Sequence, residues 1–326
     1  MSFKTTDGLM RHLRDNGIAI SGSTQKRQLL NTGYFHGYKG YRFFGTSLNR
    51  LPFTSYDEIY ATIQYDSNLK SLFYGKMMFI ETAVKNVALE SILLYTKSES
   101  IQAMYNKAVS SYKNCPASFT PDQRKKAQQD KLNLESTIQS YLSRAYRNGN
   151  PKITHFYNNV GYSGVPLWAL FEIMMLGDFG YLLSCLNYDM RNIISHNLGL
   201  NVAADTDRRL VYKYIYTLKD LRNAIAHNAV VFDTRFRNID PDKAMKRCLE
   251  QEIGLSYVNF KSIGDYVILM SYYLKLLGVT KVEIKAFIKD YEKITNEYRI
   301  AVNPNVAAKV IRPDLSSRIS TLKNYI

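Results

Sequence analysis

The chain has 326 residues, 46% of them hydrophobic, and a formal net charge of +15 at pH 7. This length supports a sizeable core without covalent crosslinks, which excludes a disulfide-dependent miniprotein. The three cysteines are odd in number, far apart and without metal-ligand spacing, so we expect reduced thiols and no metal site. The N-terminal residues lack the apolar segment of a signal peptide, and no apolar run reaches the roughly 20 residues of a membrane span. We therefore expect a cytoplasmic protein without membrane contact.

The positive charge is spread unevenly along the chain. Formal charges cancel over residues 161–240, whereas the segments on both sides are basic. A net charge of this size favours a polyanionic partner, most simply RNA, although basic character can also serve solubility alone. The 26 tyrosines and 15 phenylalanines offer surfaces on which bases could stack, but aromatic residues at helical spacing more often form core.

Residues 1–55 are predicted to form a helical and aromatic extension. A first amphipathic helix ends at Gly17, and a second is predicted to be capped by Ser23 and to end at Gly33. The next stretch, "GYFHGYKGYRFFG" (33–45), alternates aromatics with glycines and predicts an extended segment folded over a core. It is either a packed connector or a basic loop that stacks on bases through Tyr38 and Tyr41 and contacts RNA through Lys39 and Arg42.

Helices are predicted along the rest of the chain as well. Ser55 and Glu58 form a capping box before a long helix that reaches about residue 95, with a break near Asp66. Residues 97–150 are predicted to be a polar helical insertion, whose long helix starts at Thr120 and Pro121. Its basic residues are candidate RNA contacts, as are two arginines further along: Arg124, Lys125, Lys126, Arg208 and Arg209.

Buried or amphipathic helices are then expected over 165–177, 179–186, 190–198 and from 205 or 206 to 226. The last third predicts helices near 241–251, 259–277 and 281–299, followed by a tail with weak signals. Short strands are conceivable only at 18–20 and 230–232. The sequence thus predicts an all-α bundle in three parts: an extension (1–55), a helical core (56–240) that carries the insertion, and C-terminal helices with a tail (241–326).

One heptapeptide occurs twice in nearly the same form, as "RNIISHN" (191–197) and "RNAIAHN" (222–228). An arginine and a histidine can together cleave RNA without metal. The imidazole moves a proton at the ribose 2′-oxygen or the leaving 5′-oxygen, and the guanidinium stabilises the charge on the phosphoryl oxygens. Positions five apart lie about 140° apart around a helix, so the pair can meet only where the helix ends or loosens.

The two copies differ in this respect. The first is predicted to lie on a helix that ends at Gly199, which favours an ordinary C-terminal His196 stabilised by the helix dipole. The second is followed by "NAVVFDT", with β-branched residues and no strong helical run. The second copy, with Arg222 and His227, is therefore the better candidate for chemistry.

The stretch "LKDLRNAIAHNAVVFDTR" (218–235) resembles the signature of the Abi-like family of bacterial abortive-infection proteins. That family belongs to the HEPN ribonuclease superfamily, whose shared motif is Arg-x4–6-His at a helix end. "LLNTGYFHGYKGYRFF", "IYATIQYDSNLKSLF", "MFIETAVKNVAL" and "VPLWALFEIMMLGDFGYLLSCL" are similar to further family segments in the same order. The resemblance covers roughly residues 5–235 and implies a HEPN-like bundle.

The resemblance assigns Arg222 and His227 to the catalytic pair and Asn223 to the polar position after the arginine. Glu81 and Lys85 match a supporting acidic and basic pair, although an exposed i,i+4 salt bridge would look the same. After the histidine this chain has "VVFD" where the family often has Arg-Leu-Trp-Asn, so Arg235 receives no role.

The resemblance further implies an endoribonuclease toxin of a phage-defence system that needs neither metal nor cofactor. Such toxins are restrained by a small noncoding RNA, and their sites are commonly composite, which implies a homodimer. The alternative is an RNA-binding helical protein without catalysis that uses the same basic surface.

Overall fold

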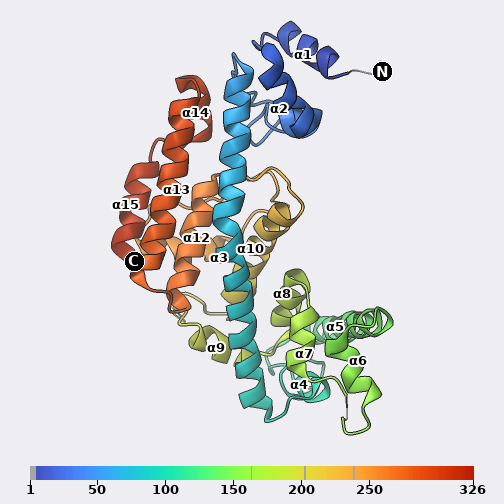
Figure 1. Cartoon of the computed structure of the whole chain (residues 1–326). Helices are drawn as coiled ribbons and strands as arrows, with labels where there is room; N and C mark the ends of the chain where they lie inside the picture. The colour runs from blue at the N-terminus through green and yellow to red at the C-terminus, as the bar shows by residue number, and fades with distance from the viewer. Residues whose placement is uncertain (1–4, 163, 202, 238) are drawn as a thin grey trace. The chain divides into compact units, whose positions relative to one another are not determined.

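The computed structural model describes residues 5–162, 164–201, 203–237 and 239–326 (Figure 1). Over these ranges the chain forms fifteen α-helices and one short π-helix, and its β pairing is limited to isolated bridges. The predicted all-α class is confirmed. Of the two segments considered for strands, 18–20 contributes one bridge, between Ala19 and Ser55, and 230–232 is a loop. No helix in the described ranges has both the length and the apolar character needed to cross a membrane.

The chain divides into two compact units. Unit 1 comprises Met1–Met78, Asp220–Pro241 and Leu249–Ile326, and unit 2 comprises Phe79–Lys219 and Asp242–Cys248. Their boundaries fall within α3 (Tyr56–Thr96), α10 (Leu210–Ala226) and α11 (Lys243–Ile253). The three-part division expected from the sequence is a different partition of the chain and stays a prediction.

The N-terminal part of unit 1 contains α1 (Thr6–Asp15), α2 (Gly22–Tyr34) and the π-helix η1 (Phe35–Lys39). The cap of α2 is Ser21, not Ser23 as predicted, and the Gln25 side chain accepts a hydrogen bond from the Ser21 amide at 2.7 Å. The extended segment predicted after Gly33 is also wrong at its start, because η1 coils tightly against α2. A Cβ on Gly37 would lie 2.6 Å from Thr32 Oγ1, so the glycine permits close packing and does not signal extension.

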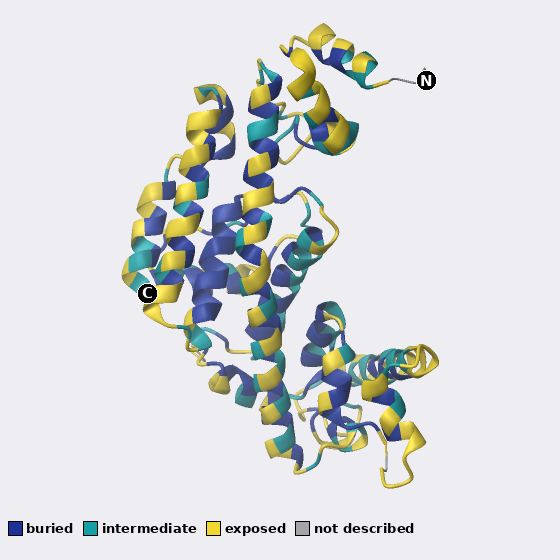
Figure 2. Cartoon of the chain, in the orientation of Figure 1, coloured by how far each residue is buried: buried dark blue, intermediate teal, exposed yellow. Residues whose placement is uncertain are grey.

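The C-terminal part of unit 1 is built around α12 (Ile263–Leu276), which is buried on nearly all sides (Figure 2). It packs against α13 (Lys281–Ala301), which also contacts α14 (Pro304–Val310) and α15 (Leu315–Tyr325). The last two helices lie in the tail where the sequence signals are weak. Helix α14 starts at Asn303, which caps it, and has Pro304 at its first helical position, where proline is favoured.

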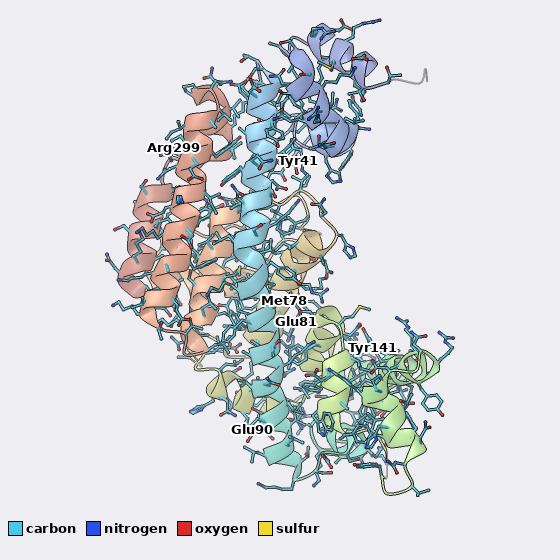
Figure 3. The ribbon with its side chains drawn as sticks, in the orientation of Figure 1. Tyr41, Met78, Glu81, Glu90, Tyr141 and Arg299 are labelled. Carbon is cyan, nitrogen blue, oxygen red and sulfur yellow. The ribbon has the colours of Figure 1, made fainter. Side chains whose placement is uncertain are left out.

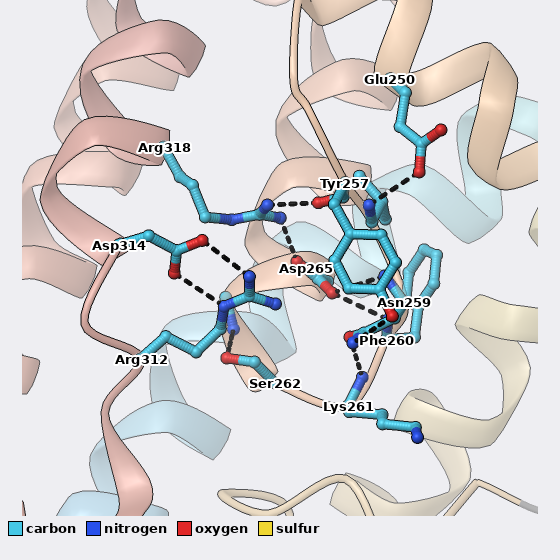
Figure 4. A network of polar contacts seen from close by, with 12 residues as sticks. Glu250, Tyr257, Asn259, Phe260, Lys261, Ser262, Asp265, Arg312, Asp314 and Arg318 are labelled. Atoms are coloured by element: carbon cyan, nitrogen blue, oxygen red, sulfur yellow. Dashed lines mark hydrogen bonds and ion pairs between the residues drawn. The ribbon is translucent and has the colours of Figure 1, made fainter. Parts of the chain in front are cut away.

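A buried ion pair fastens α15 to this core (Figure 4). The Asp265 carboxylate is fully buried and pairs with the Arg318 guanidinium, which also donates to the carbonyl oxygen of Tyr257. The other oxygen of Asp265 accepts from the amides of Asn259 and Phe260, at 3.1 and 2.8 Å. Several hydrogen bonds therefore compensate for the burial of this charge.

Unit 2 contains parts of α3, α10 and α11. Among its described residues it also has six helices of its own: α4 (Ile101–Lys107), α5 (Pro121–Arg147), α6 (Pro151–Asn158), α7 (Leu167–Ile173), α8 (Leu176–Cys185) and α9 (Tyr188–Asn197). The predicted single helix over 165–177 is wrong, because Met174 is extended and separates α7 from α8. Helix α5 begins at the predicted cap, where Thr120 and Gln123 form a capping box. Although α5 is polar, it buries Leu134, Ile138 and Leu142 on one face.

The Ser55–Glu58 capping box of α3 is confirmed, and Glu58 also binds residues outside the box. Oε2 of Glu58 accepts from the Thr54 and Ser55 amides at 2.7 and 3.2 Å, and Oε1 accepts from the Asn303 amide at 2.9 Å. Burial alone would raise the pKa of Glu58, but these hydrogen bonds outweigh it and lower the pKa below 4.5. Glu58 thus joins the start of α3 to the cap of α14.

We expect Glu58→Gln to lower the free energy of unfolding by about 1–3 kcal/mol at pH 7, because one oxygen acceptor is replaced by a donor. Since folding lowers the pKa of Glu58, its contribution is present above the unfolded-state pKa and is lost as the pH falls through the folded-state pKa. Urea unfolding at pH 7 and pH 3 measures both effects. Glu90→Gln, at an exposed position on the same helix (Figure 3), is the control. A penalty that is unchanged at pH 3 would contradict this account.

Candidate active site

The second heptapeptide ends α10 in a Schellman turn. The Asn228 amide bonds to the Ile225 carbonyl at 3.2 Å, and the Ala229 amide bonds to the Ala224 carbonyl at 2.8 Å. Asn228 has φ +51°, a left-handed conformation that asparagine tolerates better than most residues with a side chain. His227 is the cap residue just beyond the last helical residue, and it is exposed.

The first heptapeptide ends differently although its letters are nearly the same. There the left-handed position is Gly199, whose amide bonds to the His196 carbonyl at 2.9 Å, and the helix continues to Asn197. His196 therefore lies inside the last turn of α9, as predicted, whereas His227 lies past the end of α10. The two histidines thus occupy different positions relative to the helix end.

The three residues assigned to the catalytic site lie together at the end of α10. Nη1 of Arg222 donates to Oδ1 of Asn223 at 3.3 Å, and the Asn223 carbonyl accepts from the His227 amide at 3.0 Å. Arg222 and Asn223 are half-buried, and His227 is open to solvent. This helix end thus presents a guanidinium, a carboxamide and an imidazole.

A buried carboxylate holds the segment that follows His227. Asp66 lies in the first third of α3 and is fully buried, and one of its oxygens accepts from the amides of Val231 and Phe232, at 2.7 and 2.8 Å. Its other oxygen accepts from the Tyr41 hydroxyl at 3.0 Å (Figure 3 labels Tyr41 beside α3). The break predicted near Asp66 is wrong, because α3 is continuous and Asp66 serves as a buried acceptor within it.

Lys70, one turn after Asp66 on α3, connects this carboxylate to the Schellman turn. Its Nζ lies 2.8 Å from Asp66 and donates to Oδ1 of Asn228 at 2.9 Å. The ring of Tyr41 stacks on Phe232 with 5.8 Å between centroids. Burial, and next the charge of Asp66, raise the pKa of Tyr41 above 10, so its hydroxyl remains a donor. We call Asp66, Lys70 and Tyr41 the anchor.

A second contact secures the chain further along. Asp233 is fully buried, and its Oδ2 accepts from the Gly45 amide at 2.9 Å and from Arg235 Nε at 2.6 Å. Arg235 also donates to the Phe43 carbonyl at 2.7 Å. Arg235 therefore ties the loop after α10 to the N-terminal aromatic segment.

Neither Asp66 nor Lys70 was among the site residues expected from the sequence, and Tyr41, considered there as a base-stacking residue, is buried. A sequence signal exists for Asp66, because it falls on the apolar face of α3, three residues before Leu69 and seven before Phe73, both fully buried. A charged residue on such a face requires a buried partner. Which partner it meets depends on a segment 165 residues away.

The expected supporting pair belongs to unit 2. Glu81 and Lys85 form an ion pair at 3.0 Å, and both side chains are largely buried, 11% and 12% exposed, so this is not the exposed salt bridge that was considered. Lys85 Nζ also donates to the Met174 carbonyl at 2.7 Å, at the junction of α7 and α8. Within unit 2 the pair fixes that junction to α3.

Comparison with known proteins identifies the family. The family model described as "Abi-like protein" matches residues 27–233. The chain belongs to the Abi-like protein family. This membership indicates a function in abortive infection, and the matched span includes the anchor, the site at the end of α10 and Asp233. No curated protein and no solved structure matches the chain.

In this Abi-like chain, several of the basic residues expected to bind RNA already have protein partners. Arg124 donates to the carbonyls of Phe119 and Pro116, at 3.3 and 3.0 Å, and thereby orders the loop before α5. Arg208 donates to Asn192 at 2.6 Å, and Arg42 lies over the ring of Phe43 at 4.6 Å. These three side chains are held in place by the fold.

The remaining basic candidates are more available. Lys39 and Lys125 are exposed, and Arg209 is 46% exposed and 3.8 Å from Asp207. Lys126 is 74% exposed and pairs with Asp130 at 2.8 Å. Within the described ranges, no group of three or more histidine, cysteine or acidic side chains is placed to hold a metal ion.

We expect Asp66→Asn to lower the free energy of unfolding by about 2–4 kcal/mol, because Lys70 loses its buried counter-charge and two amides lose an anionic acceptor. Urea unfolding measures this loss, and hydrogen exchange at Val231 and Phe232 shows whether the loop after α10 is released. Asp290→Asn, at an exposed position on α13, makes the same charge change as a control. Unchanged exchange at both amides would show that Asp66 does not hold this loop.

Proposed function

We propose that this Abi-like chain is a metal-independent endoribonuclease whose active site is the end of α10. The observation that carries the proposal is the placement of His227, exposed just past the helix end, on a turn held by the anchor and next to Arg222 and Asn223. An imidazole in this position can reach a solvent-borne RNA strand, and the turn that carries it follows directly on the helix that carries Arg222.

The proposed reaction uses the ribose as its own nucleophile. One imidazole removes the proton of the 2′-hydroxyl, and the 2′-oxygen attacks the adjacent phosphorus. Arg222 stabilises the negative charge on the phosphoryl oxygens, and Asn223 orients the guanidinium through their hydrogen bond. A second imidazole, in its protonated form, donates a proton to the leaving 5′-oxygen. The products are a 2′,3′-cyclic phosphate and a 5′-hydroxyl end.

Two imidazoles imply two chains, because each chain has one histidine placed at a helix end in this way. We propose a HEPN-type homodimer in which the ends of the two α10 helices face each other across a two-fold axis. The net charge of +15 supports a second RNA contact, with a small structured noncoding RNA that restrains the enzyme as a toxin.

We expect His227→Ala to reduce RNA cleavage by about 10²–10⁴-fold in EDTA, because the general acid–base group is removed. Product analysis should find 2′,3′-cyclic phosphate ends for the wild type. The matched control is His196→Ala, which truncates the exposed histidine of the other heptapeptide and should leave cleavage unchanged. Cleavage that requires added Mg²⁺, or that survives His227→Ala, would rule out this mechanism. If the wild type binds RNA without cleaving it, the chain is a non-catalytic RNA-binding protein.

A mixing experiment tests the composite site. If one site takes an imidazole from each chain, a heterodimer of a wild-type and a His227→Ala chain has one imidazole and lacks either the base or the acid. We expect an excess of His227→Ala chains to lower the cleavage by a fixed amount of wild type, and sedimentation should show a dimer. A monomer that cleaves at the wild-type rate would contradict the dimer.

A further inference from the structure

Unit 2 contains a cavity that the proposed nuclease site does not use. Its volume is about 450 Å³, within the range of small-molecule sites. It is lined by residues from the loop before α5, from α5 itself, from the end of α8 and from the start of α9. The first heptapeptide contributes its arginine, Arg191, to the wall.

Arg191 is half-buried; its guanidinium makes no hydrogen bond or ion pair with any described residue, and its Nε is shielded from solvent without a partner. Guanidinium groups in such places normally meet carboxylates or phosphates, because an unpaired buried charge is costly. Burial, and next the neighbouring charge of Arg209, lower the pKa of Arg191. Two arginines thus lie close together beside an open cavity, which is the arrangement of an anion site.

The acidic groups of the wall do not cancel this charge. Asp130 is paired with Lys126 at 2.8 Å, and Asp122 is exposed at the first turn of α5. Cys185 also lines the cavity, but burial and then Asp130 raise the pKa of its thiol to about 11, so it is neutral at physiological pH. The cavity therefore has an excess of positive charge.

Aromatic side chains form another part of the wall. Tyr188, which is 43% exposed, and Phe119 both line the cavity. The guanidinium carbon of Arg208 lies 5.8 Å from the centroid of the Tyr188 ring, a cation–π contact that limits the movement of that ring. A planar group could stack here while an anion reaches the arginines.

We propose that this cavity binds a phosphorylated ligand of about the size of one nucleotide. The phosphate contacts Arg191 and Arg209, and the planar base lies against Tyr188 and Phe119. The phosphate monoester has two sources, a free nucleotide or the 5′-phosphorylated end of an RNA chain. The site is independent of the proposed nuclease, because all its residues belong to unit 2 and none is part of the α10 site.

Calorimetric titration of the full-length protein with AMP, adenosine and inorganic phosphate tests the proposal. We expect AMP to bind at least about tenfold more tightly than adenosine, and Arg191→Met to abolish that difference. Arg147→Met, at an exposed position on α5, is the control and should bind AMP like the wild type. Equal binding of AMP by the wild type and Arg191→Met, or equal binding of AMP and adenosine, would overturn the proposal.

A second measurement covers the case in which Arg191→Met disturbs folding. Without ligand, this substitution should raise the unfolding temperature or leave it unchanged, because it replaces a half-buried, unpaired guanidinium by an apolar chain of similar length. AMP should raise the unfolding temperature of the wild type and not that of Arg191→Met. A fall in the ligand-free unfolding temperature would show that Arg191 is a structural residue and would overturn the site.

The two possible sources of the phosphate, a free nucleotide and an RNA end, are distinguished by measuring the binding of short RNAs that carry a 5′-phosphate or a 5′-hydroxyl. The His227→Ala variant is used so that the RNA is not cleaved. Binding of AMP with no preference between the two RNAs supports a free nucleotide. A preference for the 5′-phosphate that Arg191→Met removes supports an RNA end. Failure of cleavage in the wild type would not affect any of these outcomes, so the nuclease proposal and this one can fail separately.

Discussion

The carboxylate of Asp66 is the one group on which the candidate active site depends. It lies within a continuous helix, fully buried, and accepts from two backbone amides of the loop that follows His227. A buried charge is tolerated only when its partners are fixed, so these partners cannot move independently of α3. Through Lys70 the same constraint extends to the turn that carries the imidazole.

The two heptapeptides show how little a short motif determines by itself. Both have an arginine, an asparagine and a His-Asn pair, but the residue that adopts the left-handed turn is Gly199 in one and Asn228 in the other. Glycine two residues past the motif lets α9 include its histidine. In α10 the asparagine of the motif itself takes the left-handed position, and the histidine becomes the cap. The helix end decides whether the histidine lies in the last helical turn or past it, and the residues after the motif decide where the helix ends.

Local rules therefore predict some of this fold well. The boxes at Ser55 and Thr120 mark the starts of α3 and α5 because the capping residues and their partners are three apart in sequence. The same rules fail where distant contacts decide. By composition Gly37 indicates an extended segment, but in the structure it packs closely against Thr32. Asp66 indicates a helix break, but α3 is continuous there and Asp66 bonds to a distant segment. The catalytic candidates at the end of α10 come from a motif, whereas the partners of Asp66 in the anchor are identified only in three dimensions.

The sequence separation of these contacts has a consequence for how the site forms. The two carboxylates that hold the loop after α10 bond across 165 and 188 residues, Asp66 to Val231 and Asp233 to Gly45. Contacts across such separations carry a large loop-closure cost, so the loop after α10 is held by segments distant from it in the sequence. The residues matched by the Abi-like family model, 27–233, include both partners of each contact, Asp66 with Val231 and Asp233 with Gly45. The match therefore covers the contacts that hold the loop after α10 and not only the Arg-x4-His motif.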